Sequence, residues 1–263
     1  MLKAALIHGI QDRPEDWIDF TESCSDFMEI ERIERPPYDE ALEKGGQWKK
    51  WDEIVQSDCR KKIAGQGFDM LLGHSGGCKR VLHLMMSERH DEDKMPNIGI
   101  VINPPRREID ESKKPTMRHF TRDSVRMLAP LLVGMPQEIW QPMIIRHGKN
   151  CRNKSVERAR IITEFKLHAK SSKEIAQTIA DIRDDIQLFV FGSKNDPWYT
   201  EVEAKENVEV RTEDDFGHYG AHVWKYEETS RLIRDFCQRH GMMQPEENVN
   251  SGKTHNKLTE VIM

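Results

Sequence analysis

A serine inside a glycine-rich stretch is the first residue whose setting suggests chemistry. The stretch Gly73-His74-Ser75-Gly76-Gly77 follows the apolar run Met70-Leu71-Leu72 and opens a segment with helical periodicity. On a tight strand-to-helix turn a serine hydroxyl stands clear of the sheet, and flanking glycines let neighbouring chains approach. The helix that follows directs its free N–H groups towards the serine. The pattern predicts a nucleophile at Ser75; the alternative is a turn of this kind that only cradles a phosphate.

Two later loops carry residues that could assist such a serine. Asp196 follows an apolar run and precedes Pro197, and His218 lies beside Gly217 in a loop before a helical segment. An acid just beyond a strand end is well placed to orient an imidazole, and a histidine on such a loop can reach the serine and take its proton as a general base. His222, four residues further on, remains an alternative base.

Acyl transfer also needs two N–H donors for the oxyanion of the tetrahedral intermediate. We expect these donors to be the backbone N–H groups of Gly76 and Ile10. The residues His8 and Gly9 end the first apolar run, and we expect them to lie near the substrate together with His74. The alternatives are an ordinary strand-ending glycine and a packing or hydrogen-bonding role for His74.

Metal ions and cofactors are not expected. His218 and His222 are four residues apart, but the glutamate of an H-E-x-x-H zinc motif is missing. The cysteines include no Cys-x-x-Cys pair, which argues against structural zinc. Their odd number, and the lack of a cleavable leader pattern, favour free thiols and a cytoplasmic location. The five cysteines are Cys24, Cys59, Cys78, Cys151 and Cys237.

The apolar runs alternate with helical patterns, which is typical of a parallel sheet covered by helices on both faces. Six strands are expected, at 3–8, 27–33, 69–73, 98–103, 186–192 and 208–212. The clearest helical patterns are at 48–64, 76–90 and 221–240. The sequence therefore predicts an α/β fold whose core comprises residues 1–105 and 183–240, followed by a disordered tail at 241–263.

Residues 106–182 exceed the length of a crossover helix and carry further helical patterns, so we expect a helical lid insertion. From Pro104 to Ala180 there are 16 Lys and Arg against 8 Asp and Glu, a net +8. Because the net charge of the whole chain is −5, the remaining residues together carry a net charge of −13. The basic run at 146–160 is either a solvated helix face or a surface that attracts an anionic or carrier-linked acyl substrate.

From Met1 to about His240, the chain resembles the α/β-hydrolase superfamily. The resemblance rests on the turn at Ser75, the His8-Gly9 strand end, the Asp196-Pro197 turn and the Gly217-His218 loop. The antiparallel hairpin that usually opens this fold is absent, which implies a trimmed sheet. The resemblance implies a lid over the active site and a serine hydrolase mechanism with an acyl-enzyme intermediate.

We expect a serine esterase or thioesterase. An acyltransferase on the same triad, or a hydrolase-like protein that only binds ligands, are the alternatives. The expected partner is a small-molecule acyl substrate. The acidic net charge and the lack of nucleic-acid motifs argue against nucleic-acid binding, and no apolar run is long enough to span a membrane.

Overall fold

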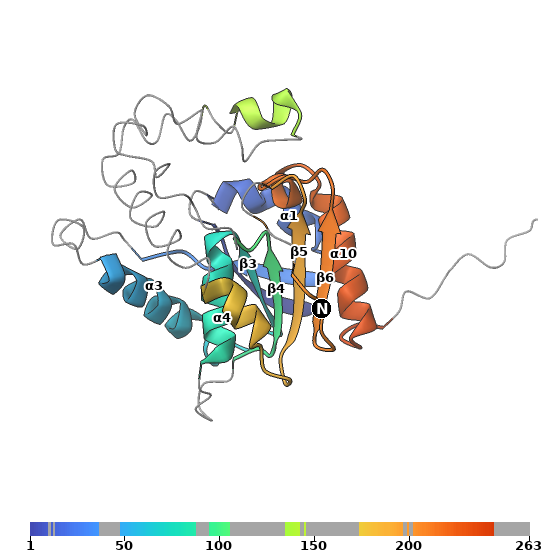
Figure 1. The fold of residues 1–263 in the computed structure, drawn as a ribbon. Helices are drawn as coiled ribbons and strands as arrows, with labels where there is room; N and C mark the ends of the chain where they lie inside the picture. Colours follow the sequence, from blue (N-terminus) through green and yellow to red (C-terminus); the bar gives the residue numbers. More distant parts are fainter. Residues whose placement is uncertain are drawn as a thin grey trace, which may run out of the picture.

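The six apolar runs form one parallel sheet in the computed structural model of the chain (Figure 1). The structure describes residues 1–9, 12, 14–36, 48–87, 95–105, 135–142, 145, 174–196, 199 and 202–244. The strand order among the described residues is β2-β1-β3-β4-β5-β6, so the predicted parallel sheet of about six strands is confirmed. The strands are β1 (Leu2–Ile7), β2 (Met28–Arg32), β3 (Met70–His74), β4 (Ile98–Ile102), β5 (Gln187–Ser193) and β6 (Val208–Glu213).

Helices cover both faces of this sheet, as predicted (Figure 1). On one face lie α3 (Trp48–Ile63), α4 (Gly76–Met86) and the helical residues 174–180. On the other lie α1 (Ile18–Ser23), α9 (Gly220–Val223) and α10 (Tyr226–Arg239), with the 3-10 turn η1 (Pro14–Trp17) ahead of α1. The carboxyl ends of all six strands therefore meet at one edge, where the loops carrying Ser75, Asp196 and His218 begin or end.

Strand β5 shows how a continuous apolar run supplies both layers of the core. Leu188 and Val190 belong to the core layer that includes residues of α3 and α4, whereas Phe189 and Phe191 belong to the layer that includes residues of α1 and α10. Successive side chains of a strand point to opposite faces of the sheet. When helices cover both faces, the side chains on both sides are buried, and the strand is apolar along most of its length. The ring of Phe189 stacks on Phe236 of α10 with centroids 5.1 Å apart.

Three helical segments differ from the sequence prediction. Helix α4 ends at Met86, not at His90, and Ser87 is extended with ψ 149°. The single helix predicted at 221–240 is two helices, because the carbonyl oxygen of Gly220 accepts hydrogen bonds from both Trp224 and Lys225 and closes α9 after one turn. Residues 14–23, for which no helix was predicted, form η1 and α1.

The four cysteines in the described part of the chain are free thiols and buried. Cys59 and Cys78 lie in the layer of α3 and α4, and Cys24 and Cys237 lie in the layer of α1 and α10. Burial raises the pKa of Cys24 to about 11 and that of Cys237 to about 12.

Most of the predicted lid lies outside the described residues, as do the predicted tail beyond residue 244 and Cys151. Of the insertion, residues 137–142 are helical, and so are residues 174–180 at its end. Within the described ranges, no helix has both the length and the apolar character needed to cross a bilayer.

The fold depends on a glycine at position 77, and this can be tested. A Cβ built on Gly77 would lie 2.0 Å from the carbonyl oxygen of Ile7. Because backbone atoms on both sides resist displacement, Gly77→Ala should destabilise the protein by on the order of 3 kcal/mol or more. Thermal unfolding of the purified variant would measure the loss.

Gly220→Ala is the matched control. A Cβ at Gly220 would lie 3.4 Å from its nearest neighbour, the Cβ of Phe216, and the residue is helical. Alanine there should leave stability unchanged or raise it by about 0.5 kcal/mol. Equal unfolding temperatures for the two variants would contradict the close approach of α4 to β1.

Candidate active site

Ser75 occupies a strained backbone conformation between β3 and α4. Its φ of 50° and ψ of −120° lie in a backbone region that residues other than glycine rarely adopt. The N–H of Ser75 donates to the carbonyl oxygen of Ile102 at 3.0 Å, and the N–H of Cys78 donates to the carbonyl oxygen of Ser75 at 3.0 Å. Hydrogen bonds to β4 and within the first turn of α4 therefore hold the residue in this conformation, which accompanies functional sites in many proteins.

The structure brings Ser75, His218 and Asp196 together in one chain of hydrogen bonds. His218 Nε2 lies 2.9 Å from Ser75 Oγ, and His218 Nδ1 lies 2.8 Å from Asp196 Oδ2. The exposed fractions of the three residues are 4%, 1% and 2%. With Nδ1–H donating to the Asp196 carboxylate, the lone pair of Nε2 faces the Ser75 hydroxyl, which can donate to it.

Polar side chains at the end of β5 bind the loop that carries His218. Ser193 Oγ accepts hydrogen bonds from the N–H groups of Phe216 and Gly217, at 3.1 and 3.0 Å. Asn195 Oδ1 accepts a second bond from the Gly217 N–H at 2.7 Å. These bonds satisfy buried backbone donors and fix the loop just before the histidine.

Asn103, directly after β4, binds the same loop from another strand end and was not among the residues predicted for the site. Its Nδ2 donates to the carbonyl oxygens of Gly217 and His218, both at 2.9 Å, and its Oδ1 accepts from the Ser193 N–H at 3.0 Å. Asn103 is fully buried and has a φ of 49°. Asparagine tolerates this conformation better than most residues, so an asparagine at a predicted strand end was the available signal.

His74 and Asp12 form a buried pair beside Ser75 and His218. His74 Nδ1 lies 2.6 Å from Asp12 Oδ2, and His74 Nε2 lies 2.8 Å from the carbonyl oxygen of His218. Asp12 Oδ2 also accepts a hydrogen bond from the Gly9 N–H at 2.8 Å. Asp12 was not predicted, although an acid shortly after a His-Gly strand end is visible in the sequence.

The charges of this pair support each other. Burial alone would raise the pKa of Asp12 and lower that of His74. The charge and hydrogen bond of the partner outweigh burial in both cases, so the pKa of Asp12 lies well below its ordinary value and that of His74 lies above it. We therefore describe the pair as a carboxylate and an imidazolium.

His222, the alternative base, does not occupy the position beside Ser75. Its ring stacks on Trp17, with centroids 3.9 Å apart and planes 6° apart. Both ring nitrogens are buried and have no hydrogen-bond partner among the described residues. Burial and the nearby charge of His74 hold the pKa of His222 well below its ordinary value, so the ring is neutral.

Asp12, His74 and His222 are the described residues that could hold a metal ion. Their donor atoms lie within 4.8 Å of one another. However, the 2.6 Å between Asp12 Oδ2 and His74 Nδ1 is a hydrogen-bond distance. Two ligands of a tetrahedral zinc ion would be about 3.4 Å apart, given zinc–ligand bonds of about 2.0 to 2.2 Å. The arrangement fits an ion pair better than a metal site.

The segment that follows β1 passes directly beside Ser75. A Cβ on Gly9 would lie 3.1 Å from the Cβ of Ser75, and the Arg35 guanidinium donates to the carbonyl oxygens of His8 and Gly9. His8 and Gly9 are thus near the serine, whereas Ile10 lies outside the described residues. His74, the third residue expected near the substrate, is fully buried and has both ring nitrogens bound within the protein.

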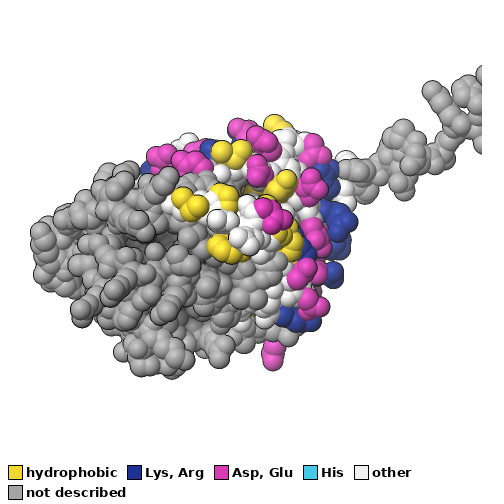
Figure 2. Space-filling view, turned by 90° about the horizontal axis from the view of Figure 1, so that it is seen from above, with side chains coloured by type: hydrophobic (Ala, Val, Ile, Leu, Met, Phe, Trp, Pro, Cys, Tyr) yellow, Lys and Arg dark blue, Asp and Glu magenta, His cyan; other side chains and the backbone are white. Residues whose placement is uncertain are grey.

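Part of the predicted lid contacts the loop that carries His218. Met135 packs on Tyr219, and Ile139 and Trp140 join this contact from the helical residues 137–142. Figure 1 shows this short helix above the carboxyl edge of the sheet. Seen from that edge, the described surface that is visible mixes hydrophobic and acidic side chains, with Lys and Arg along one side (Figure 2).

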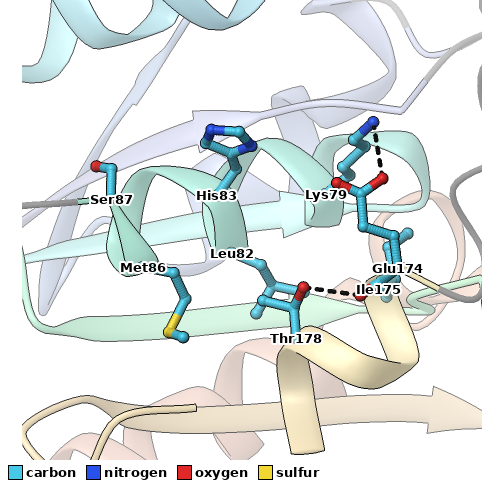
Figure 3. A pocket seen from close by; sticks show the side chains of 8 residues that line it. All are labelled: Lys79, Leu82, His83, Met86, Ser87, Glu174, Ile175 and Thr178. Carbon is cyan, nitrogen blue, oxygen red and sulfur yellow. Dashed lines mark hydrogen bonds and ion pairs between the residues drawn. The ribbon is translucent and has the colours of Figure 1, made fainter. Parts of the chain in front are cut away.

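A separate pocket of about 160 Å³ lies between α4 and residues 174–180 (Figure 3). An ion pair between Lys79 Nζ and Glu174 Oε2, at 3.3 Å, joins its two walls. Its lining includes none of the residues around Ser75. The residues that line it are Lys79, Leu82, His83, Met86, Ser87, Glu174, Ile175 and Thr178.

The Asp12–His74 pair should make stability depend on pH in a defined way. Between about pH 4 and 6.5 both groups are charged in the folded and the unfolded chain, so the pair contributes fully. Above this range the unfolded chain loses the His74 proton first, because the folded pKa is raised. Below it the unfolded chain protonates Asp12 first, because the folded pKa is lowered. The contribution therefore falls in both directions.

Asp12→Asn should consequently cost most stability near pH 5.5, on the order of 1 to 3 kcal/mol. Thermal unfolding of wild type and variant at pH 5.5 and 8.5 checks this, with the wild-type advantage expected to be smaller at pH 8.5. His8 and His222 face Asp12, and Asp196 faces His74, so the difference between the two proteins is the quantity to compare. An advantage that grew with pH would contradict the ion pair.

Comparison with known proteins identifies the fold. No protein-family model matches the sequence, and no curated protein matches it. Among solved structures, the N-acyl homoserine lactone degrading enzyme Est816 aligns with a TM-score of 0.61 at 13% identity, over 90% of this chain and 93% of its own. The enol-lactonase from Burkholderia xenovorans gives 0.61 at 14%, over 90% and 91%. The Cif epoxide hydrolase from Acinetobacter nosocomialis gives 0.58 at 14%, over 89% and 82%. The chain has the α/β-hydrolase fold.

Proposed function

We propose that this protein is a serine hydrolase that cleaves esters or thioesters through an acyl-enzyme. The observation that carries the proposal is the hydrogen-bond chain from Asp196 through His218 to Ser75, with the serine in its strained turn. A protein that only binds ligands has no need for a buried acid, base and hydroxyl in this order.

In the first half of the reaction, Ser75 Oγ forms a bond to the carbonyl carbon of the substrate while His218 Nε2 takes the hydroxyl proton. The negative charge moves to the carbonyl oxygen. We propose that the backbone N–H of Gly76, at the start of α4, donates a hydrogen bond to this oxyanion. The intermediate then collapses. The bond to the leaving alcohol or thiol breaks, and this group receives the proton from His218.

In the second half, water attacks the acyl carbon and gives a proton to His218. The bond to Ser75 Oγ breaks, and the serine regains its proton from the imidazolium. Asp196 remains a carboxylate throughout and stabilises the imidazolium by accepting the Nδ1 proton in a hydrogen bond. The residues end in their starting protonation states.

The substrate class is supported by the chemistry of the residues around Ser75. A serine nucleophile with a neutral imidazole base suits attack on an acyl carbon. Two neighbours are an enol-lactonase and an enzyme that degrades N-acyl homoserine lactone, and a lactone is a cyclic ester. An epoxide hydrolase shares the fold as well, so the proposal for an acyl substrate rests on the residues around Ser75.

Ser75→Ala tests the nucleophile. Wild type should become covalently labelled by a fluorophosphonate probe at Ser75, as shown by peptide mass, and the variant should not. With any ester that the wild type hydrolyses, turnover should fall by about 10⁵- to 10⁶-fold. The thermal unfolding temperature should show that the variant is folded. Labelling of the variant at the wild-type rate would refute the proposal.

Alanine at each histidine tests which one is the base. His218→Ala should slow labelling by about 10³-fold or more, because the serine proton then has no acceptor. His222→Ala should retain labelling within about fivefold, although the cavity under Trp17 should cost about 2 kcal/mol of stability. Labelling rates at a temperature well below both unfolding transitions provide the measurement. The reverse order would assign the base to His222.

A further inference from the structure

The carbonyl oxygen of His218 accepts hydrogen bonds from two side chains on neighbouring strand ends. His74 Nε2 reaches it from the end of β3 at 2.8 Å, and Asn103 Nδ2 reaches it from the end of β4 at 2.9 Å. A backbone carbonyl in a loop needs only one donor to be satisfied. Two donors from the sheet fix the position of this peptide group, and with it the Cα from which the imidazole extends.

The His74 ring cannot turn, because its other nitrogen is also bound. Nδ1 lies 2.6 Å from Asp12 Oδ2, and that oxygen accepts the Gly9 N–H at 2.8 Å. A carbonyl and a carboxylate both accept hydrogen bonds, so both nitrogens of the ring donate and the ring carries two protons. The ring also contacts its neighbours, with centroids 5.0 Å from His218 and 4.5 Å from His222.

We propose that His74, oriented by Asp12, is a positioning residue that places His218 opposite Ser75 by donating from Nε2 to the His218 carbonyl oxygen. The inference rests on the proposed function, since it concerns the alignment of the same nucleophile and base. His74 is the last residue of β3 and directly precedes Ser75. One short segment therefore holds the serine and also determines where its base lies. Asp12 extends the same connection to Gly9 at the end of β1.

The two amide side chains can separate this role from a purely structural one. Glutamine at position 74 places its Nε2 donor near the Nε2 of the histidine, towards the His218 carbonyl. Asparagine places its Nδ2 donor near the Nδ1 of the histidine, towards Asp12. His74→Gln therefore keeps the bond to the loop and loses the bond to the acid, and His74→Asn does the reverse.

The expected orders of stability and reactivity are opposite. Among the described residues, His74→Gln leaves the buried Asp12 carboxylate with the Gly9 N–H as its one hydrogen-bond donor, so this variant should unfold at a lower temperature than His74→Asn. Yet the maximal rate of fluorophosphonate labelling should stay within about fivefold of wild type for His74→Gln and fall about 10- to 100-fold for His74→Asn. The probe concentration giving half-maximal rate should change little, because His74 is buried and does not face the probe.

Exposed His83, on α4 and away from the cluster, provides the matched control. His83→Gln should label like wild type. If His74→Gln does not fold, combining each substitution with Asp12→Asn removes the unpaired carboxylate, and the same order of labelling rates is expected between the two double variants.

Three results would be decisive against the inference or its basis. If His74→Asn labels as fast as His74→Gln, or if the rates follow the unfolding temperatures, His74 has only a structural role. If zinc added to the full chain changes the labelling rate and this response requires His74, the cluster is a metal site. If wild type is not labelled at Ser75 at all, the proposed function itself fails, irrespective of His74.

Discussion

The first turn of α4 lies so close to the end of β1 that position 77 has no room for a side chain, and the carbonyl oxygen of Ile7 occupies the place of its Cβ. This approach forces a sharp reversal between β3 and α4, and Ser75 takes the strained conformation that the reversal requires. The strain costs roughly 1 to 3 kcal/mol. Packing of α4 on the sheet and the hydrogen bond from Ser75 to β4 offset that cost. Everything that surrounds the serine is arranged relative to this turn.

Around the turn, the ends of the strands carry polar side chains that bind backbone groups of another loop. His74, Asn103 and Ser193 follow or end three neighbouring strands, and each bonds to the backbone of residues 216–218. A buried polar side chain is costly unless it is hydrogen-bonded. Here each one is hydrogen-bonded to a backbone group of the loop, and the His218 carbonyl oxygen accepts from both His74 and Asn103. The result is a loop without regular secondary structure that is nevertheless held at defined points.

The sequence was sufficient for the parts governed by periodicity and local spacing. The six strands, the two-layer covering and the turn at Ser75 depend on apolar runs and glycines that lie next to one another in the chain. Asp12 and Asn103 were not predicted because their hydrogen-bond partners, His74 and His218, lie 62 and 115 positions away in the sequence, respectively. The break between α9 and α10 was not predicted either. It depends on the Gly220 carbonyl oxygen, which accepts hydrogen bonds from two N–H groups, and the spacing of apolar residues does not indicate this.

The distribution of the buried thiols has a practical consequence for following motion. The thiolate is the reactive form, and burial disfavours it at all four described cysteines. An alkylating reagent can therefore reach them only when the surrounding layer opens. Because one pair lies under α3 and α4 and the other under α1 and α10, the alkylation rates of individual cysteine peptides would report separately how often each side of the sheet exposes its interior.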